Sequence, residues 1–189
     1  MLAYVFWHWP RPDTSRDEYE RLQRRFHVAL RDAPPVGFLG SHTDAIGAVP
    51  WIGHAGAAYE DWYHLEDGTA LEPLNEAAVT ASRRSPHDAA AAVAAGGTAG
   101  LYRLRMGSVG GTAPTVAAWF SKPEGMTYAG LDELLESPVR SGGGFLWCRQ
   151  MVLGPTPEFC LRSAAPVVLP APVVPLLVSL RRLWPSSGT

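Results

Sequence analysis

The segment Leu2–Trp9 restricts the fold of this chain more than any other. Its two alternating faces are both largely apolar or aromatic: Tyr4 and Phe6 share one face, and Trp7 lies on the other. A strand with one face in water alternates polar and apolar residues, whereas a strand covered on both faces is apolar throughout. We therefore expect this segment to be a central strand of a sheet.

The segments that follow predict alternating helices and strands. A capping box begins at Ser15, and Tyr19, Leu22 and Phe26 then recur at helical spacing. The remaining predicted elements are strands at 37–43 and 57–65, helices over 71–81 and from Ser85 to the glycines at 96–97, and a strand at 100–106. This order, β-α-β-β-α-β, is that of a ferredoxin-like α+β unit.

A Gly-rich joint is followed by a shortened version of the same order. Val116–Phe120 leads into a proline as the first strand does, a shorter helix follows over 128–136, and Gly144–Leu146 repeats Gly37–Leu39. We therefore predict two tandem ferredoxin-like halves, the second degenerate: 1–107, a joint at 108–114, 115–169, and a Pro-rich C-terminal arm at 170–189. The alternative is that two unrelated α+β segments look alike.

The Pro-rich arm is too apolar to remain in water. Prolines at 170, 172 and 175 exclude a central strand or helix there, yet Val173 and Leu180 need burial. We expect the arm to pack on its own core, or on a neighbouring subunit in a homo-oligomer. A short helix is predicted near Leu176–Leu183.

A single ferredoxin-like unit covers one face of its sheet with helices and leaves the other face open. An aromatic open face requires a cover, which a second sheet can provide. Two fused halves would then form a barrel-like enclosure within one chain.

The chain resembles the dimeric α+β barrel superfamily, which includes EthD-like proteins, antibiotic-biosynthesis-type monooxygenases and chlorite-dismutase-like haem proteins. The local similarity is to the EthD-like pattern, in which a helix after the first strand carries an aromatic residue and then an aromatic–His pair. Here these are Tyr19 and Phe26-His27. The resemblance implies a cavity between sheets that holds a small organic molecule, or haem in some branches. It implies no particular reaction.

Composition excludes several classes of protein. A net charge of −2 and a pI near 6.3 exclude a general nucleic-acid-binding surface, and 47% hydrophobic residues exclude disorder. We expect no signal peptide, no membrane span and a cytoplasmic protein. In that compartment Cys148 and Cys160 are expected to be reduced thiols.

Six histidines are the main candidates for chemistry: His8, His27, His42, His54, His64 and His87. None has the spacing of a short metal-binding motif, so no metal site is predicted. We propose His8 and His64 as catalytic acid–base groups, on the expectation that their strands are parallel neighbours and bring them together. The alternative is that both are hydrogen-bonded, half-exposed residues at strand ends. His27 is expected at the edge of its helix's contact with the sheet.

The segment 60–64 combines acidic and aromatic residues and supplies further candidates for ligand binding. Asp61 lies in a buried strand and needs a basic partner, for which Arg103 or Arg105 is expected. Without one its pKa would rise, and it could act as a base. The predicted ligand-binding residues are Trp7, Trp9, His42, Asp61, Trp62 and Tyr63.

These observations favour a small-molecule-binding protein, and within that class a cofactor-free enzyme with an aromatic and histidine pocket between the sheets. The alternative is a non-catalytic binding or scaffold protein whose core is filled by its own Trp and Tyr rings. A haem protein is the remote alternative. An open cavity of ~300 Å³ or more distinguishes the first class from the second.

Overall fold

The structure, a computed structural model, describes residues 1–151 and 154–185. It divides into two compact units. The first comprises Met1–Ala99 and the strand that begins at Arg181, and the second comprises Gly100–Leu180. Among the described residues, no helix is both long and apolar enough to cross a bilayer.

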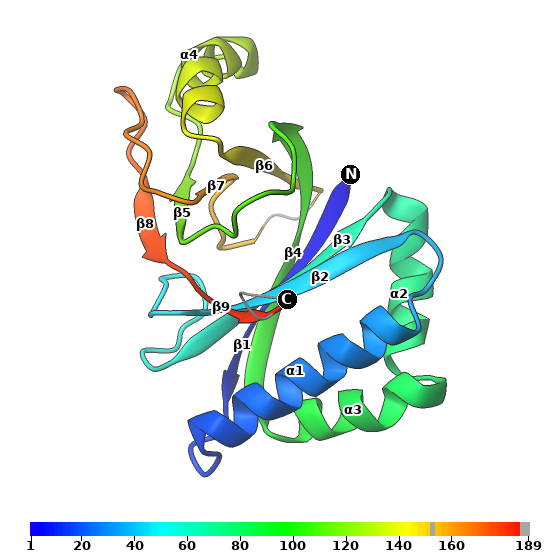
Figure 1. Ribbon diagram of the computed structural model, residues 1–189. Coiled ribbons are helices and arrows are strands. Elements are labelled where there is room, and N and C mark those ends of the chain that lie inside the picture. Colours follow the sequence, from blue (N-terminus) through cyan, green and yellow to red (C-terminus); the bar gives the residue numbers. More distant parts are fainter. Residues whose placement is uncertain (152–153, 186–189) are drawn as a thin grey trace. The chain divides into compact units, whose positions relative to one another are not determined.

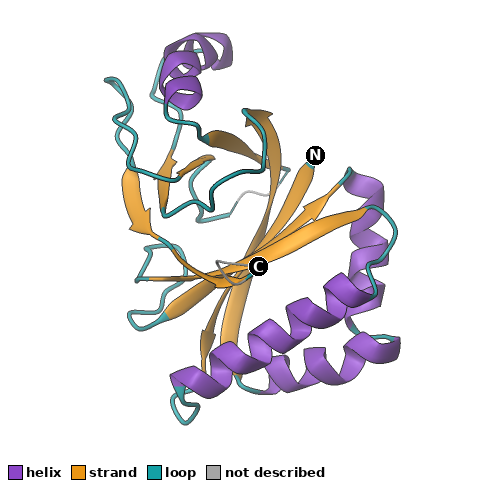
Figure 2. Ribbon diagram, viewed as in Figure 1, coloured by secondary structure: helices purple, strands orange, loops and turns teal. Residues whose placement is uncertain are grey.

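The first unit contains the helices and strands that surround the candidate site. They are β1 (Leu2–Pro10), α1 (Arg16–Asp32), β2 (Phe38–Ile46), β3 (Ala58–Leu65), a 3-10 turn (Gly68–Ala70), α2 (Leu71–Ala78), α3 (Ala81–Ala92), the first residues of β4 (Ala94–Met106), and β9 (Arg181–Trp184). Figures 1 and 2 show the three helices on one side of these strands.

Strand β3 lies between β1 and β2 and runs antiparallel to both. The helical crossover α1 returns the chain so that β2 runs in the direction of β1, and β3 then comes back beside β2. β4 lies next to β1, and β9 next to β2. The order β4-β1-β3-β2 is that of a ferredoxin-like unit, as the sequence predicts.

Helix α1 forms where its sequence pattern predicts it. The Ser15 side chain accepts a hydrogen bond from the Glu18 backbone N–H at 3.3 Å, which satisfies one of the free donors of the first turn. Tyr19, Leu22 and Phe26 are buried against the sheet side. Each contributes roughly 1.5–3 kcal/mol through removal of apolar area from water.

Helix α3 differs from the prediction at both ends. It begins at Ala81, so Pro86 lies within the helix and not at its first position. It ends at Ala92, and the glycines at 96 and 97 belong to β4. Their role is close approach between strands: a Cβ on Gly97 would lie 2.4 Å from Phe6 Cζ. Glycine marks the end of a helix in some sequences and a close contact within a strand in others, so the sequence alone does not distinguish the two.

The second unit repeats the strand arrangement of the first. It contains the remainder of β4, β5 (Val116–Phe120), α4 (Tyr128–Ser141), β6 (Phe145–Gln150), β7 (Phe159–Ser163) and β8 (Leu176–Ser179). β7 lies between β5 and β6, and β8 lies beside β5. The order β8-β5-β7-β6 therefore matches β4-β1-β3-β2. Cys148 on β6 and Cys160 on β7 are buried free thiols.

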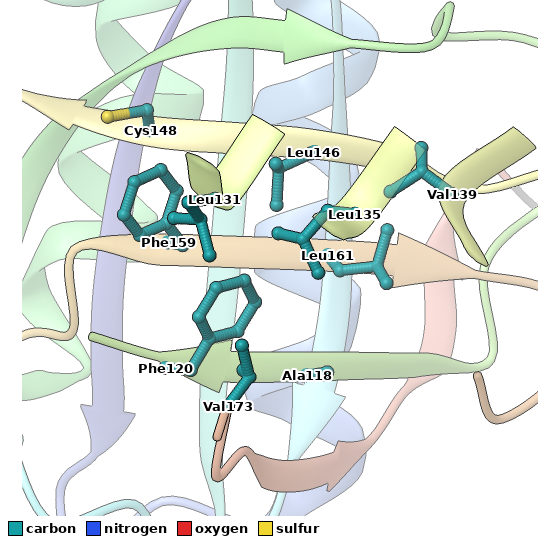
Figure 3. Packing of buried hydrophobic residues seen from close by; sticks show 10 residues of the cluster. All are labelled: Ala118, Phe120, Leu131, Leu135, Val139, Leu146, Cys148, Phe159, Leu161 and Val173. Carbon is teal, nitrogen blue, oxygen red and sulfur yellow. The ribbon is translucent and has the colours of Figure 1, made fainter. Parts of the chain in front are cut away.

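The core of the second unit lies between α4 and its strands (Figure 3). Leu131, Leu135 and Val139 come from the buried face of α4. They pack with Ala118, Phe120, Leu146, Cys148, Phe159, Leu161 and Val173. Because Val173 belongs to the Pro-rich arm, this first part of the arm packs on the core of the second unit. Contact with a neighbouring subunit stays a prediction.

The predicted helix near Leu176–Leu183 is wrong. The segment forms β8, which pairs with β5, and β9, which pairs with β2. Both partners are edge strands whose outer backbone groups would otherwise lack partners, and this pairing outweighs a short helix that would bury little apolar surface.

Candidate functional site

The first unit contains a cavity of about 430 Å³ between its sheet and its helices. Tyr4, Phe6 and His8 of β1 line the sheet side together with Asp61 and Tyr63 of β3. Side chains alternate along a strand, so these five residues share the face that the helices cover. The sequence predicts a pocket between two sheets. This cavity lies elsewhere, because the wall opposite the sheet consists of helices.

The helices leave space because their inner residues are small. Ala78 of α2 and Ala90 of α3 line the helix side with larger apolar residues that include Phe26 and Leu74, and Ala94 at the start of β4 also lines the cavity. A leucine at any of these alanine positions would occupy part of the cavity. Asn75 is exposed and His87 half-buried, so these two lining residues form the rim.

Asp61 is the centre of a buried polar cluster. Its Oδ1 lies 3.3 Å from His8 Nε2, and its Oδ2 lies 3.3 Å from His27 Nε2. The Tyr63 hydroxyl donates to Oδ2 at 2.9 Å. The side chains of Asp61, His8 and His27 are 2%, 1% and 0% exposed. A buried carboxylate is thus opposed by two imidazoles and a phenol, as burial of a charge requires.

Each imidazole is held on its other side by a hydroxyl group. His8 Nδ1 lies 2.6 Å from the Tyr19 hydroxyl, and His27 Nδ1 lies 2.7 Å from Ser41 Oγ. Thr43 Oγ1 is also 2.5 Å from His27 Nε2. The nitrogen that faces a carboxylate carries the proton in the favourable tautomer, so the hydroxyls of Tyr19 and Ser41 donate to the Nδ1 atoms.

The cluster keeps a negative charge on Asp61 and protons on the phenols. Burial alone would raise the pKa of Asp61, but the charges of His8 and His27 beside it hold this pKa well below its ordinary value. Burial, reinforced by the Asp61 charge, raises the pKa of Tyr19 and of Tyr63. The tyrosines therefore remain hydrogen-bond donors at neutral pH.

The structure places the two predicted catalytic histidines apart. β1 and β3 are antiparallel, with Ala3 opposite His64 and His8 opposite Tyr59. The expectation that His8 and His64 meet on parallel strands is wrong. In this topology β1 is parallel to β2, and the intervening β3 reverses direction. Among the predicted site residues, His8, Asp61 and Tyr63 line the cavity.

Other predicted site residues lie on the opposite face of the same strands. The indole N–H groups of Trp7 and Trp62 donate to Glu60 at 3.2 and 3.1 Å, and all three side chains are fully buried. His42 Nδ1 lies 3.1 Å from His64 Nε2. Trp7, Trp62, His42 and His64 do not line the cavity. Ligand binding by the first three and the catalytic role of His64 stay predictions.

Trp9 also lies outside the cavity lining. Its ring stacks on His54 with centroids 5.4 Å apart, and it packs against the position of Gly96. Its role in ligand binding stays a prediction.

The expected arginine partners of Asp61 are not its partners. Arg103 is exposed, and Arg105 donates to Asp132 at 2.6 and 2.7 Å. His8 and His27 take that place. His27 was expected at the edge of the helix–sheet contact, but it is completely buried.

A signal for His27 was present in the sequence. Tyr19, Gln23 and His27 are spaced four residues apart, so they form one stripe on α1 beside the apolar stripe. A polar stripe that adjoins a buried face indicates a buried polar partner across the interface, and Asp61 is that partner.

The donor atoms of the cavity do not form a metal or haem site. Within residues 1–151 and 154–185, no cluster of three or more His, Cys, Asp or Glu side chains could hold a metal ion. Haem iron needs an axial ligand, usually an imidazole nitrogen, directed at it. His8 is held between Tyr19 and Asp61, and His87 at the rim lies 3.1 Å from Asp88 through Nδ1. These residues do not fit buried haem ligation.

Each of the two units has an α+β fold with the ferredoxin-like strand order. No protein-family model and no curated protein matches the sequence. Among solved structures, a protein of Fusobacterium nucleatum assigned provisionally as a monooxygenase is similar, with a TM-score of 0.64, 10% identity and coverage of 96% of this chain and 92% of that one.

Two further structures have the same fold. One is a protein of Lactobacillus acidophilus, also assigned provisionally as a monooxygenase, with a TM-score of 0.54, 10% identity and coverage of 96% of this chain and 94% of that one. The other is assigned provisionally as a chlorite dismutase, with a TM-score of 0.52, 10% identity and coverage of 96% and 95%. At this identity the similarity shows the fold alone.

Proposed function

We propose that the protein binds a small organic molecule in the cavity of the first unit and acts on it as a cofactor-free enzyme through His8 and Asp61. The observation that supports this proposal most strongly is the cavity itself. Its volume of about 430 Å³ lies within the ~300–1,000 Å³ typical of ligand sites. Its walls are mostly apolar, and one side ends in the buried carboxylate–imidazole cluster.

The cluster has the parts that proton transfer requires. An imidazole accepts and releases protons near neutral pH, and a carboxylate beside it fixes the orientation of the ring and stabilises the protonated form. His8 is the imidazole at the cavity wall, and Asp61 is its carboxylate. His27 and Tyr63 hold Asp61 at its other oxygen, so they act as positioning residues.

The similar structures support an activity on small molecules. The names assigned to them, monooxygenase and chlorite dismutase, both describe enzymes with small substrates.

We also propose that the two units arose by tandem duplication within one chain. The shared strand order of the two units and the strand-helix-strand-strand succession found in each of them, β1-α1-β2-β3 and β5-α4-β6-β7, support it. In the second unit the Pro-rich segment occupies the place of the second helical segment.

A non-catalytic protein with a self-filled core is the second candidate. The fully buried Trp7 and Trp62, both bonded to Glu60, favour it for the other face of the sheet. An open cavity on the helix-covered face favours a ligand site there.

Native mass spectrometry of freshly purified protein, with its absorption spectrum, tests the proposal. Ala90→Leu narrows the cavity, and Ala92→Leu is the matched control, because Ala92 is exposed on the same helix and does not line the cavity. We expect a co-purified organic molecule in the wild type and in Ala92→Leu, and its loss in Ala90→Leu. A Soret band would support the haem alternative. A ligand-free protein that also binds no added aromatic compound would contradict the proposal.

His8→Gln separates catalysis from binding. Glutamine retains an N–H donor but does not exchange protons near neutral pH. Once a turnover assay exists for the co-purified molecule, His8→Gln should retain binding and lose turnover. Turnover at the wild-type rate would contradict the role of His8.

A further inference from the structure

We infer that the ligand carries a hydroxyl group on an apolar frame, and that this hydroxyl binds His8 Nε2 and Asp61 Oδ1 together. The inference rests on the proposed function, because it concerns the same cavity. It names the chemical class of the ligand, which the proposed function leaves open.

The two atoms are buried and lack hydrogen-bond partners. His8 Nε2 and Asp61 Oδ1 are 3.3 Å apart, and neither makes a hydrogen bond with acceptable geometry. Both residues line the cavity. A buried polar atom without a partner is costly, and in native proteins it generally has a reason. The simplest such reason is a ligand that supplies the missing hydrogen-bond partners.

The other polar atoms of this pair are already engaged. Asp61 Oδ2 accepts the Tyr63 hydroxyl at 2.9 Å, and His8 Nδ1 lies 2.6 Å from the Tyr19 hydroxyl. The remaining demand is therefore for one acceptor opposite Nε2 and one donor opposite Oδ1.

A hydroxyl group satisfies both demands with one oxygen atom. Its oxygen accepts from His8 Nε2–H, and its hydrogen is donated to Asp61 Oδ1. The hydrogen bond to Oδ1 is charge-assisted, because Asp61 is ionised, and it is therefore among the stronger kinds.

Other functional groups satisfy the pair less well. An ether or a ketone accepts from Nε2 but leaves Oδ1 without a donor. A carboxylate or phosphate would place a second negative charge against Asp61. A hydrocarbon would leave both atoms unpaired. The pair therefore selects a neutral hydroxyl over its nearest chemical analogues.

The rest of the cavity selects the frame. Phe6, Phe26 and Leu74 contribute aromatic and aliphatic walls, and the alanine positions of the helix side leave a smooth apolar surface. Such walls favour a flat ring system. A hydroxylated aromatic or alicyclic compound combines both requirements.

Calorimetric titration of the wild-type protein with a matched set of compounds tests the inference without any variant. The set is naphthol, methoxynaphthalene, naphthalene and naphthoate, which share one frame. We expect naphthol to bind about tenfold or more tightly than methoxynaphthalene, the factor expected when one buried polar atom is left unpaired. Naphthoate should bind most weakly.

Two variants locate the effect. In Asp61→Asn the preference for naphthol over methoxynaphthalene should fall, because the charge that accepts the hydroxyl proton is absent. In Ala90→Leu naphthol binding should weaken strongly, whereas Ala92→Leu should bind like the wild type. Undiminished naphthol binding to Ala90→Leu would overturn the placement in this cavity.

The results distinguish this inference from the proposed function. Equal affinity for naphthol and methoxynaphthalene, with both lost in Ala90→Leu, overturns the hydroxyl inference and leaves the cavity as a binding site. If none of the four compounds binds, both the inference and the proposed function are overturned.

Discussion

Replacing Asp61 by asparagine should destabilise the protein strongly, because Asp61 is a buried charge with charged partners. Asparagine has nearly the same shape, so the change removes the carboxylate charge and leaves the packing in place. Asp61 faces His8 and His27 at 3.3 Å each and accepts the Tyr63 hydroxyl at 2.9 Å. Breaking a buried ion pair by removal of one partner costs about 3–5 kcal/mol, so we expect a loss of about 3 kcal/mol at pH 7.

The loss should depend on pH in a defined direction. The pKa of Asp61 in the folded protein lies below its ordinary value of 3.8. A depressed pKa contributes stability that is fully present above the unfolded-state pKa and is lost as the pH falls towards the folded-state pKa. The difference between wild type and Asp61→Asn should therefore be constant above about pH 5 and decrease below about pH 4.

Urea unfolding of both proteins at pH 7 and pH 3.5 measures this difference. Asp88→Asn is the control, because Asp88 also lies beside a histidine, at 3.1 Å from His87 Nδ1, but is exposed. The control should change stability by no more than about 0.5 kcal/mol. An equally small change for Asp61→Asn at pH 7, or a larger change at pH 3.5 than at pH 7, would refute the reasoning.

Three further changes test other parts of the account. Gly97→Val places a Cβ where 2.4 Å separates it from Phe6 Cζ, so thermal unfolding should show a loss of about 1–3 kcal/mol. Leu131→Ala removes a fully buried side chain of the second core, and urea unfolding should show a loss of about 2–5 kcal/mol. Arg182→Ala breaks the 2.7 Å pair with Asp44 that attaches β9 to β2, and hydrogen exchange should be faster in both strands.

Matched controls keep these predictions specific. Gly68→Ala meets no atom within 4 Å, Leu39 is 50% exposed, and the Arg140–Glu136 pair lies on the surface. Alanine at Gly68, at Leu39 or at Arg140 should change stability by no more than about 0.5 kcal/mol. Control effects as large as the test effects would contradict the assigned contacts.

The parts of the fold that could be predicted are those in which local pattern and burial agree. The two apolar faces of Leu2–Trp9 predict a central strand, and β1 lies between β3 and β4. The cap at Ser15 and the stripe after it predict α1. The arm after Pro170 was harder, because its strand pairing depends on edges of β5 and β2 that are distant in sequence.

The candidate site was predicted only in part, for physical reasons. Asp61 lies in an apolar strand, so its need for a buried partner is visible in the sequence. The sequence does not show that His27 is the partner, because the helix residue that faces Asp61 depends on how α1 is rotated over the sheet. Arg103 and Arg105 carry the right charge, but Arg103 is exposed and Arg105 pairs with Asp132.

The pairing of His8 with His64 failed for a different reason. Strand direction follows from the crossover α1, and antiparallel pairing of β1 with β3 places these residues at opposite ends and on opposite faces. The cavity itself depends on alanines of α3, which the sequence shows only as a good helix-forming composition.

The most direct test of the central claim is the NMR spectrum of alanine methyl groups during titration with naphthol. The account predicts that the methyl signals of Ala90 and Ala94 shift together with the imidazole signals of His8, while those of Ala92, and of Ala118 in the second core, stay unchanged. Shifts centred on Ala118, or no shift at Ala90 and Ala94 at saturating naphthol, would contradict a ligand site between the sheet and the helices of the first unit.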